Sequence, residues 1–278
     1  MDLFLIILAF VWLIIASLQD IKKREVPNWL NFSLIVFALV YRAFYSSISG
    51  DLMFFVYGLA GFFVFVGLAY AFYYGRIFAG GDAKLLMGLG AILPFYNSIN
   101  SNLVIFGLFI FLLLLAGSVY GLLYSFVLVM KNHGRFVKEF NKEFKSRKKL
   151  ILIGLVFAVL SLVFVFYFQE AIFIVLPLLI LAFPILLIYS KAIENSCMIV
   201  EMLGNKVTVG DWLYEKVKVR GRIIKPNWEG LSEEEVKLLK KVKKVKIKQG
   251  IPFVPSFLIA FILLLLFWDY IIGLFFSI

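Results

Sequence analysis

Two aspartates, Asp20 and Asp82, each lie at the end of an apolar segment, in the stretches ASLQDIKKREVPN and FAGGDAKLLMG. Two carboxyl groups held close together resist double ionisation, so one can act as a general base toward water and the other as a general acid. Such a pair can hydrolyse an amide bond without help, and we expect neither a cofactor nor a metal. A carboxylate beside lipid is costly to keep, which favours a functional role for both.

Other residues with catalytic chemistry are scarce. The chain has one cysteine, Cys197, and one histidine, His133. They cannot supply a cysteine cluster or a histidine-rich metal site, and His133 lies in a basic stretch where we expect it to be solvated. A second Gly-Asp pair ends in Asp211 and is followed by polar sequence, so Asp211 is predicted to be a turn residue.

The composition indicates what must position the two aspartates. Of the 278 residues, 63% are hydrophobic and only 16% are charged, which predicts an all-α polytopic membrane protein. A helix needs roughly 20 apolar residues to cross a hydrocarbon layer of about 30 Å. About eight transmembrane helices are predicted, although six or seven remain possible because the fourth segment is short and the hairpin at 150–190 can be assigned differently. The eight segments are residues 3–19, 29–45, 52–74, 83–96, 102–130, 150–168, 171–190 and 253–275.

The positions of lysine and arginine predict the orientation of these helices, since cytoplasmic loops carry an excess of both. With the N-terminus outside, every basic residue except Arg42 falls on the inner side. We therefore expect both termini outside the cell membrane and both aspartates at its cytoplasmic face. Arg42, Lys84 and Asp269 lie near the ends of their segments, where a charged side chain can extend to the interface.

Composition also predicts the domains. Residues 1–190 are expected to form a transmembrane domain that includes a basic cytosolic loop at 131–149. A cytosolic α+β insert follows at 191–252, and 253–278 hold the last transmembrane helix.

The insert carries its own local signals. Alternating β-branched residues at 205–224 predict a short strand or hairpin. Ser232 and Glu235 form a capping box that begins a helix. We expect this helix to lie on the inner membrane surface and to contact lipids. A nucleic-acid partner is not expected, because the positive-inside bias already explains the basic charge. The apolar face of the predicted helix holds Val236, Leu239, Val242 and Val245.

Three blocks of the sequence carry a resemblance to a known family. They are AGGDAKLLMGLGAILP at 79–94, SLQDIKKREVPN at 17–28 and QGIPFVPSFLIAF at 249–261. In order and placement they resemble the GxGD segment, the first-aspartate segment and the start of the last helix in the prepilin and preflagellin peptidases. The chain departs from the motif at Ala79, where a strict GxGD has glycine. The resemblance implies that Asp20 and Asp82 are catalytic and that the following residues support them: Gly80, Gly81, Lys84, Pro27, Asn28, Pro252, Phe253 and Pro255.

The resemblance also implies a function. Members of this family are intramembrane aspartic endopeptidases of the GxGD type. The chain is accordingly expected to cleave basic leader peptides from type IV pilin-like or archaeal flagellin precursors at the cytoplasmic membrane face. It begins directly in its first helix and has no cysteine cluster, so it resembles an archaeal form without N-methyltransferase activity.

Other interpretations stay open on the sequence alone. Asp82 can simply be the N-cap of the fourth helix, with Gly80 and Gly81 forming the turn before it; alternatively, these glycines let a substrate strand approach closely. The same aspartates also suit a proton- or cation-coupled transporter, although transport sites commonly lie near the midplane. A membrane scaffold with a basic module is a third reading, which leaves the three blocks unexplained.

Overall fold

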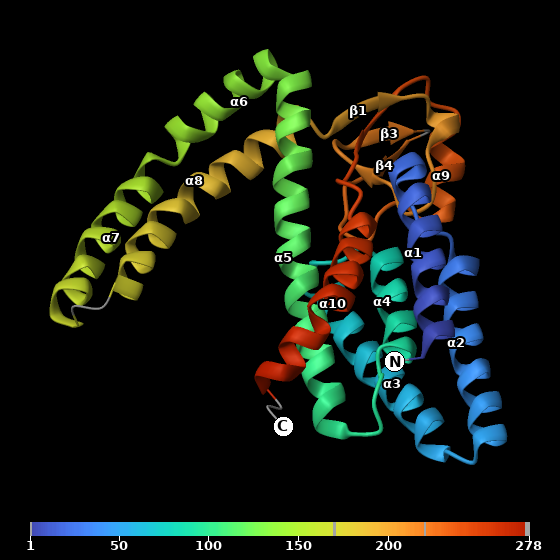
Figure 1. Cartoon of the computed structure of the whole chain (residues 1–278). Coiled ribbons are helices and arrows are strands. Elements are labelled where there is room, and N and C mark those ends of the chain that lie inside the picture. The colour runs from blue at the N-terminus through green and yellow to red at the C-terminus, as the bar shows by residue number, and fades with distance from the viewer. Residues whose placement is uncertain (1, 169–170, 220, 276–278) are drawn as a thin grey trace. The chain divides into compact units, whose positions relative to one another are not determined.

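The structure is a computed structural model that describes residues 2–168, 171–219 and 221–275, and helices dominate it (Figure 1). All eight predicted apolar segments are helical. Six helices within the described ranges are long and apolar enough to cross a membrane, which confirms a polytopic helical protein. The eight are α1 (Leu3–Lys23), α2 (Asn28–Ser49), α3 (Leu52–Tyr74), α4 (Gly80–Ile92), α5 (Ile99–Lys131), α7 (Lys148–Phe168), α8 (Val175–Ser196, after the 3₁₀ turn η1 at Ala171–Ile174) and α10 (Val254–Phe275).

One of these helices falls short of a full span. Helix α4 has 13 residues and is therefore about 20 Å long, less than the hydrocarbon layer of about 30 Å. The prediction of a short fourth helix is thus confirmed. Helix α10 has 22 residues and is long enough to cross the layer. The side chain of Asp269 lies outside the described part of the chain.

Local sequence signals set the ends of the first helices. The carboxylate of Asp2 accepts the backbone N–H of Leu5 at 3.1 Å and caps α1. That helix ends at Arg24, whose φ of 60° is left-handed. Helix α2 ends at Gly50 with φ 72°, a conformation that glycine adopts at no steric cost. Asp51 then caps α3 by accepting the N–H of Met53 at 3.1 Å.

The chain forms two compact units, one of Met1–Leu123 with Ile251–Ile278 and the other of Tyr124–Gly250. In the first unit, α4 packs between α2 and α3, and α1 packs against α10 (Figure 1). Helices α3 and α4 approach closely where Gly61 meets Gly90. A Cβ atom added to Gly90 would lie only 2.7 Å from the carbonyl oxygen of Gly61. Small residues allow such backbone contact, as is common between membrane helices.

The prediction that the side chain of Arg42 extends to the membrane interface was wrong. Its side chain is 1% exposed, and its guanidinium donates to the carbonyls of Ala91, Ile92 and Pro94 at the end of α4. The physical reason is that α4 ends within the unit, and the last carbonyls of a helix have no partner inside it. The guanidinium supplies the missing donors.

The second unit contains a helix that the sequence analysis missed. Residues 131–149 were expected to be a loop, but α6 (His133–Ser146) occupies most of that range. Phe136, Phe140 and Phe144 recur every four residues, with ring centroids 5.6 and 6.3 Å apart. The ring of Phe136 also meets that of Tyr189 on α8 at 5.7 Å. This aromatic stripe folds the segment as an amphipathic helix despite its many charges. His133 is exposed, as expected.

The insert is a small α+β fold, as predicted. A three-stranded antiparallel sheet has the order β1-β5-β2, and β3 pairs with β4 as a hairpin. The hairpin turns at Gly221, whose φ is 83°. The side chain of Asp211 accepts the N–H of Thr208 at 2.7 Å, which confirms it as a turn residue. The elements are β1 (Ile199–Met202), the 3₁₀ turn η2 (Gly204–Lys206), β2 (Trp212–Leu213), β3 (Val217–Val219), β4 (Arg222–Ile224), α9 (Glu233–Leu239) and β5 (Val245–Lys248).

One helix of the insert was predicted too long. The capping box of Ser232 and Glu235 does begin α9, but the helix ends at Leu239, and Val245 opens strand β5. Val245 and Ile247 alternate with lysines, which is the period of a strand. Val236 and Leu239 are buried in the core of the insert. The expectation that this apolar face lies on the membrane was therefore wrong.

Candidate active site

Asp20 lies in the last turn of α1 and is 6% exposed. Its Oδ2 accepts the backbone N–H of Val254, the first residue of α10, at 2.9 Å. The N–H of Phe253 also donates to this carboxylate. The N-terminus of a helix is a favourable place for a negative charge, because its first N–H groups have no partner within the helix. Asp20 thus joins the end of the first helix to the start of the last.

Asp82 is the third residue of α4 and is partly buried. Its carboxylate accepts the backbone N–H of Ala79, the residue that caps this helix. Asp82 is therefore not the N-cap that the simpler interpretation proposed, although its bond to Ala79 is half of a capping box. However, its charge also interacts with that of Asp20, which no capping role requires. The fold brings the two predicted aspartates together at one end of α1 and α4.

The first turn of α4 is held by the first turn of α2. The Nδ2 of Asn31 donates to the carbonyl of Gly81 at 3.2 Å. The Nζ of Lys84 donates to the Oδ1 of Asn28 at 2.8 Å, and Pro27 immediately precedes α2. Two of the predicted supporting residues, Lys84 and Asn28, therefore join the starts of α4 and α2. Asn31 was missed, although a second asparagine one turn after Asn28 in an apolar helix was a visible signal.

The two glycines before Asp82 do not form the turn that one of the two open interpretations gave them. Gly80 and Gly81 are the first residues of α4, and neither has a positive φ. A Cβ atom at Gly81 would lie 3.5 Å from the Cβ of Val26, and one at Gly80 would lie 3.8 Å from the ring of Tyr73. Both are ordinary contacts, so the fold itself does not require glycine at either position.

The start of α10 is packed by aromatic rings. The ring of Phe253 lies 5.3 Å from that of Phe78, which is buried just before α4. A Cβ atom at Gly117 of α5 would lie 2.5 Å from the ring of Phe253, so this approach is tight. Pro252 and Pro255 flank the first residue of α10 and are buried. These residues fix the place where the N–H of Val254 meets Asp20. Phe78 was not singled out from the sequence, because one phenylalanine among many gave no signal.

Three buried side-chain atoms of the described chain have no hydrogen-bond partner: Ser17 Oγ, Asn31 Oδ1 and Ser256 Oγ. Each lies on a helix that carries one of the aspartates or contacts the segment around it. Ser17 lies one turn before Asp20, Ser256 lies two residues after Val254, and Asn31 binds the residue before Asp82. Buried polar atoms normally have partners, so unpaired ones mark positions that can bind water or a polar group of a substrate.

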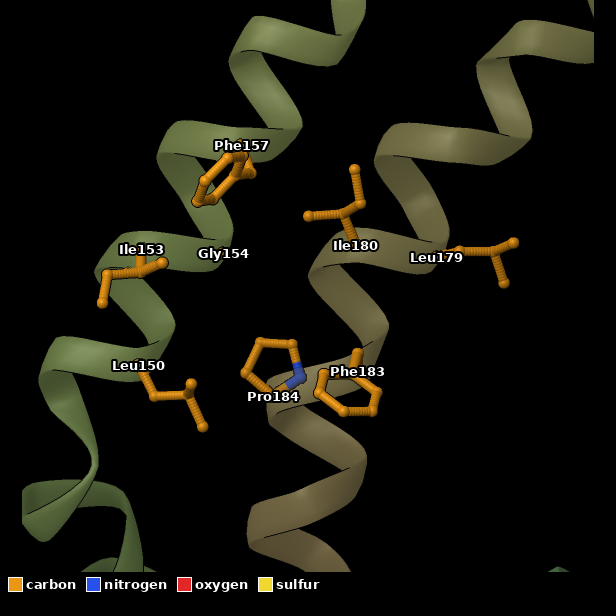
Figure 2. A pocket seen from close by; sticks show the side chains of 8 residues that line it. All are labelled: Leu150, Ile153, Gly154, Phe157, Leu179, Ile180, Phe183 and Pro184. Atoms are coloured by element: carbon orange, nitrogen blue, oxygen red, sulfur yellow. The ribbon is translucent and has the colours of Figure 1, made fainter.

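An apolar pocket of about 440 Å³ lies elsewhere, on the hairpin of α7 and α8 (Figure 2). None of its side chains can act as an acid, a base or a nucleophile, so it is no candidate for the chemistry. Helices α7 and α8 pack closely there, where a Cβ atom at Gly154 would lie 3.1 Å from the ring of Pro184. The pocket is lined by Leu150, Ile153, Gly154, Phe157, Leu179, Ile180, Phe183 and Pro184.

Comparison with known proteins gives one family. Residues 7–126 match the model of the type IV leader peptidase family, and this range includes both aspartates. The third sequence block, at 249–261, lies beyond it.

Three curated relatives are named preflagellin peptidase. The protein of Methanocaldococcus jannaschii is 37% identical over 91 residues, which cover 33% of this chain and 38% of the relative. The protein of Methanococcus voltae is 36% identical over 84 residues, which cover 30% of this chain and 36% of the relative. The protein of Methanococcus maripaludis is 32% identical over 134 residues, which cover 45% of this chain and 57% of the relative. The chain thus matches less than two thirds of each relative, and no solved structure matches it.

Proposed function

We propose that this chain is an aspartic endopeptidase of the membrane that removes leader peptides from preflagellin or type IV pilin-like precursors. Asp20 and Asp82 are its catalytic pair. One observation carries the proposal: two carboxyl groups from separate apolar helices interact, and both lie in the segment that matches the type IV leader peptidase family.

The chemistry follows from the contacts of the pair. The N–H groups of Val254 and Phe253 hold the carboxylate of Asp20 in place, and Asp82 lies close enough for the two charges to interact. The ionised carboxyl group takes a proton from water, and its oxygen attacks the peptide carbonyl. The protonated carboxyl group donates to the carbonyl oxygen as the tetrahedral intermediate forms. Transfer of a proton to the departing amine then breaks the C–N bond.

The placement of the pair suits a substrate that is itself held in the bilayer. A precursor with an apolar helix after its leader would keep that helix in the membrane and present the scissile bond at the cytoplasmic face. Gly80 and Gly81 carry no side chain, which allows a substrate backbone to approach the chain before Asp82 closely. The net charge of +11 would repel a basic leader, so the leader must be recognised by local contacts.

A transport function has no support among the comparisons. The matching family and the three relatives are all peptidases by name.

The proposal is tested with the full chain purified in detergent and a preflagellin precursor, with the products identified by mass spectrometry. Wild-type protein should release the leader, and Asp82→Asn should not. Asp211→Asn is the matched control, because it changes the other Gly-Asp pair at a turn of the insert. It should cleave at the wild-type rate. Cleavage by folded Asp82→Asn at that rate would refute the assignment.

A further inference from the structure

The C-terminal end of α4, opposite Asp82, has carbonyl groups that need hydrogen-bond donors from outside the helix. A helix of about 20 Å cannot cross a layer of about 30 Å, so one of its ends lies within the apolar region. The last residues of α4, Ala91 and Ile92, are fully buried, and the last carbonyls of a helix have no partner inside it. Something in the protein must bind them.

Arg42 of α2 performs this role almost alone. Its Nε donates to the carbonyl of Ala91 at 2.7 Å, and its Nη2 donates to those of Ile92 at 3.0 Å and Pro94 at 2.6 Å. Its Nη1 donates to the carbonyl of Phe54 on α3 at 2.7 Å. Four carbonyls are thus joined by one planar group with fixed donor directions.

The surroundings are shaped for this side chain. Gly58 makes room for it, because a Cβ atom there would lie 2.7 Å from the Nε of Arg42. The guanidinium lies 4.5 Å from the ring centroid of Phe54, a favourable cation–π distance. A charge that is 1% exposed would be very costly without such partners. The surrounding residues therefore form a specific binding site for the guanidinium.

The same site reaches the start of α1. The charge of Asp2 interacts with that of Arg42, and Asp2 accepts the hydroxyl of Tyr41 at 2.9 Å. Asp2 also caps α1, the helix that carries Asp20 at its other end. Arg42 therefore lies near the start of one aspartate-bearing helix and binds the end of the other. The aspartates meet at the opposite ends of these two helices.

We propose that Arg42 is a positioning residue, which fixes α4 along its axis so that Asp82 stays level with Asp20. The inference rests on the proposed function. Asn31 and Lys84 tie the start of α4 to α2. The bonds from Arg42 tie its other end to the same helix, so that both ends of α4 are fixed. A misplacement of about 1 Å at a catalytic centre can lower a rate by about 100-fold.

The test compares Arg42→Lys and Arg42→Gln with wild type in the full chain, using a preflagellin precursor. Neither side chain can join the carbonyls of Ala91, Ile92 and Pro94 in one plane. We expect kcat, normalised to monodisperse folded protein, to fall by about 10- to 100-fold, with KM within about twofold. The pH profile of kcat should also change shape, because the coupling between two carboxyl groups depends on their separation.

Ser46→Ala is the matched control. Its hydroxyl is buried one turn along α2 and donates to the carbonyl of Asp51 at 2.7 Å without touching α4. This variant should keep the wild-type kcat and pH profile even if its Tm falls. If Arg42→Gln does not fold, Arg42→Lys carries the test.

A purely structural role would scale the pH profile without changing its shape, and that result, or a wild-type kcat, would overturn the inference. Hydrogen exchange of the amides in the first turn of α4 gives a readout that needs no activity. Exchange should quicken in the Arg42 variants and not in Ser46→Ala; unchanged exchange would also overturn the inference. If wild-type protein cleaves no precursor, the proposed function fails, while the exchange measurement still decides whether Arg42 holds α4.

Discussion

The bond between Val254 and Asp20 gives a prediction that can be followed in detail. Val254→Pro removes the N–H donor at the first residue of α10, a position where proline fits a helix well. Hydrogen bonds to charged groups contribute about 1.5–3 kcal/mol. If this bond is needed to hold the carboxylate in its reactive position, the loss corresponds to a fall in kcat/KM of about 10- to 100-fold.

The assay is cleavage of a preflagellin precursor at substrate concentrations well below KM, with equal amounts of folded protein. Val254→Ala is the control, because it keeps the N–H group and removes only two methyl groups from a fully buried side chain. It should lose stability but little activity. Equal rates for the proline and alanine variants would refute the reasoning, since only the proline lacks the donor.

The glycines of the first unit give two further predictions. Gly81→Ala should leave Tm within about 2 °C, because the new methyl group meets Val26 at an ordinary 3.5 Å, yet it should slow cleavage by occupying space beside the substrate. A wild-type rate would remove the glycines from substrate binding. Gly90→Ala should instead lower Tm by several degrees, because its Cβ would press on the Gly61 carbonyl and the side chain of Phe65. Thermal unfolding in detergent checks this, and an unchanged Tm would show that α3 and α4 can separate freely.

Local patterns account for what the sequence predicted well. The long apolar runs gave the membrane helices, and the Ser232–Glu235 pair gave the start of α9, because each signal lies within a few residues. The two aspartates were found for a similar reason, as isolated carboxylates at the ends of apolar segments. Which residues surround them depends on contacts between distant helices, and no local pattern contains that information.

The failures share this cause. From the sequence, Arg42 was interpreted as a charge near a helix end, because the carbonyls that it binds lie about 50 residues further along the chain. Val245 fitted a helical period with Val242, but pairing with β1 made it part of a strand. In α6 the charges hid a regular stripe of phenylalanines. Asn31 and Phe78 became visible only when α2, α4 and α10 were placed together.

The central claim is that Asp20 and Asp82 act as one catalytic unit. It is tested most directly by single-turnover cleavage with Asp20→Asn, Asp82→Asn and the double variant, each shown to be folded. Residues that act together are not additive, so each single variant should lose about as much activity as the double variant, on the order of 1,000-fold or more. If the two losses multiply instead, or if either single variant cleaves at the wild-type rate, the aspartates do not form a catalytic pair.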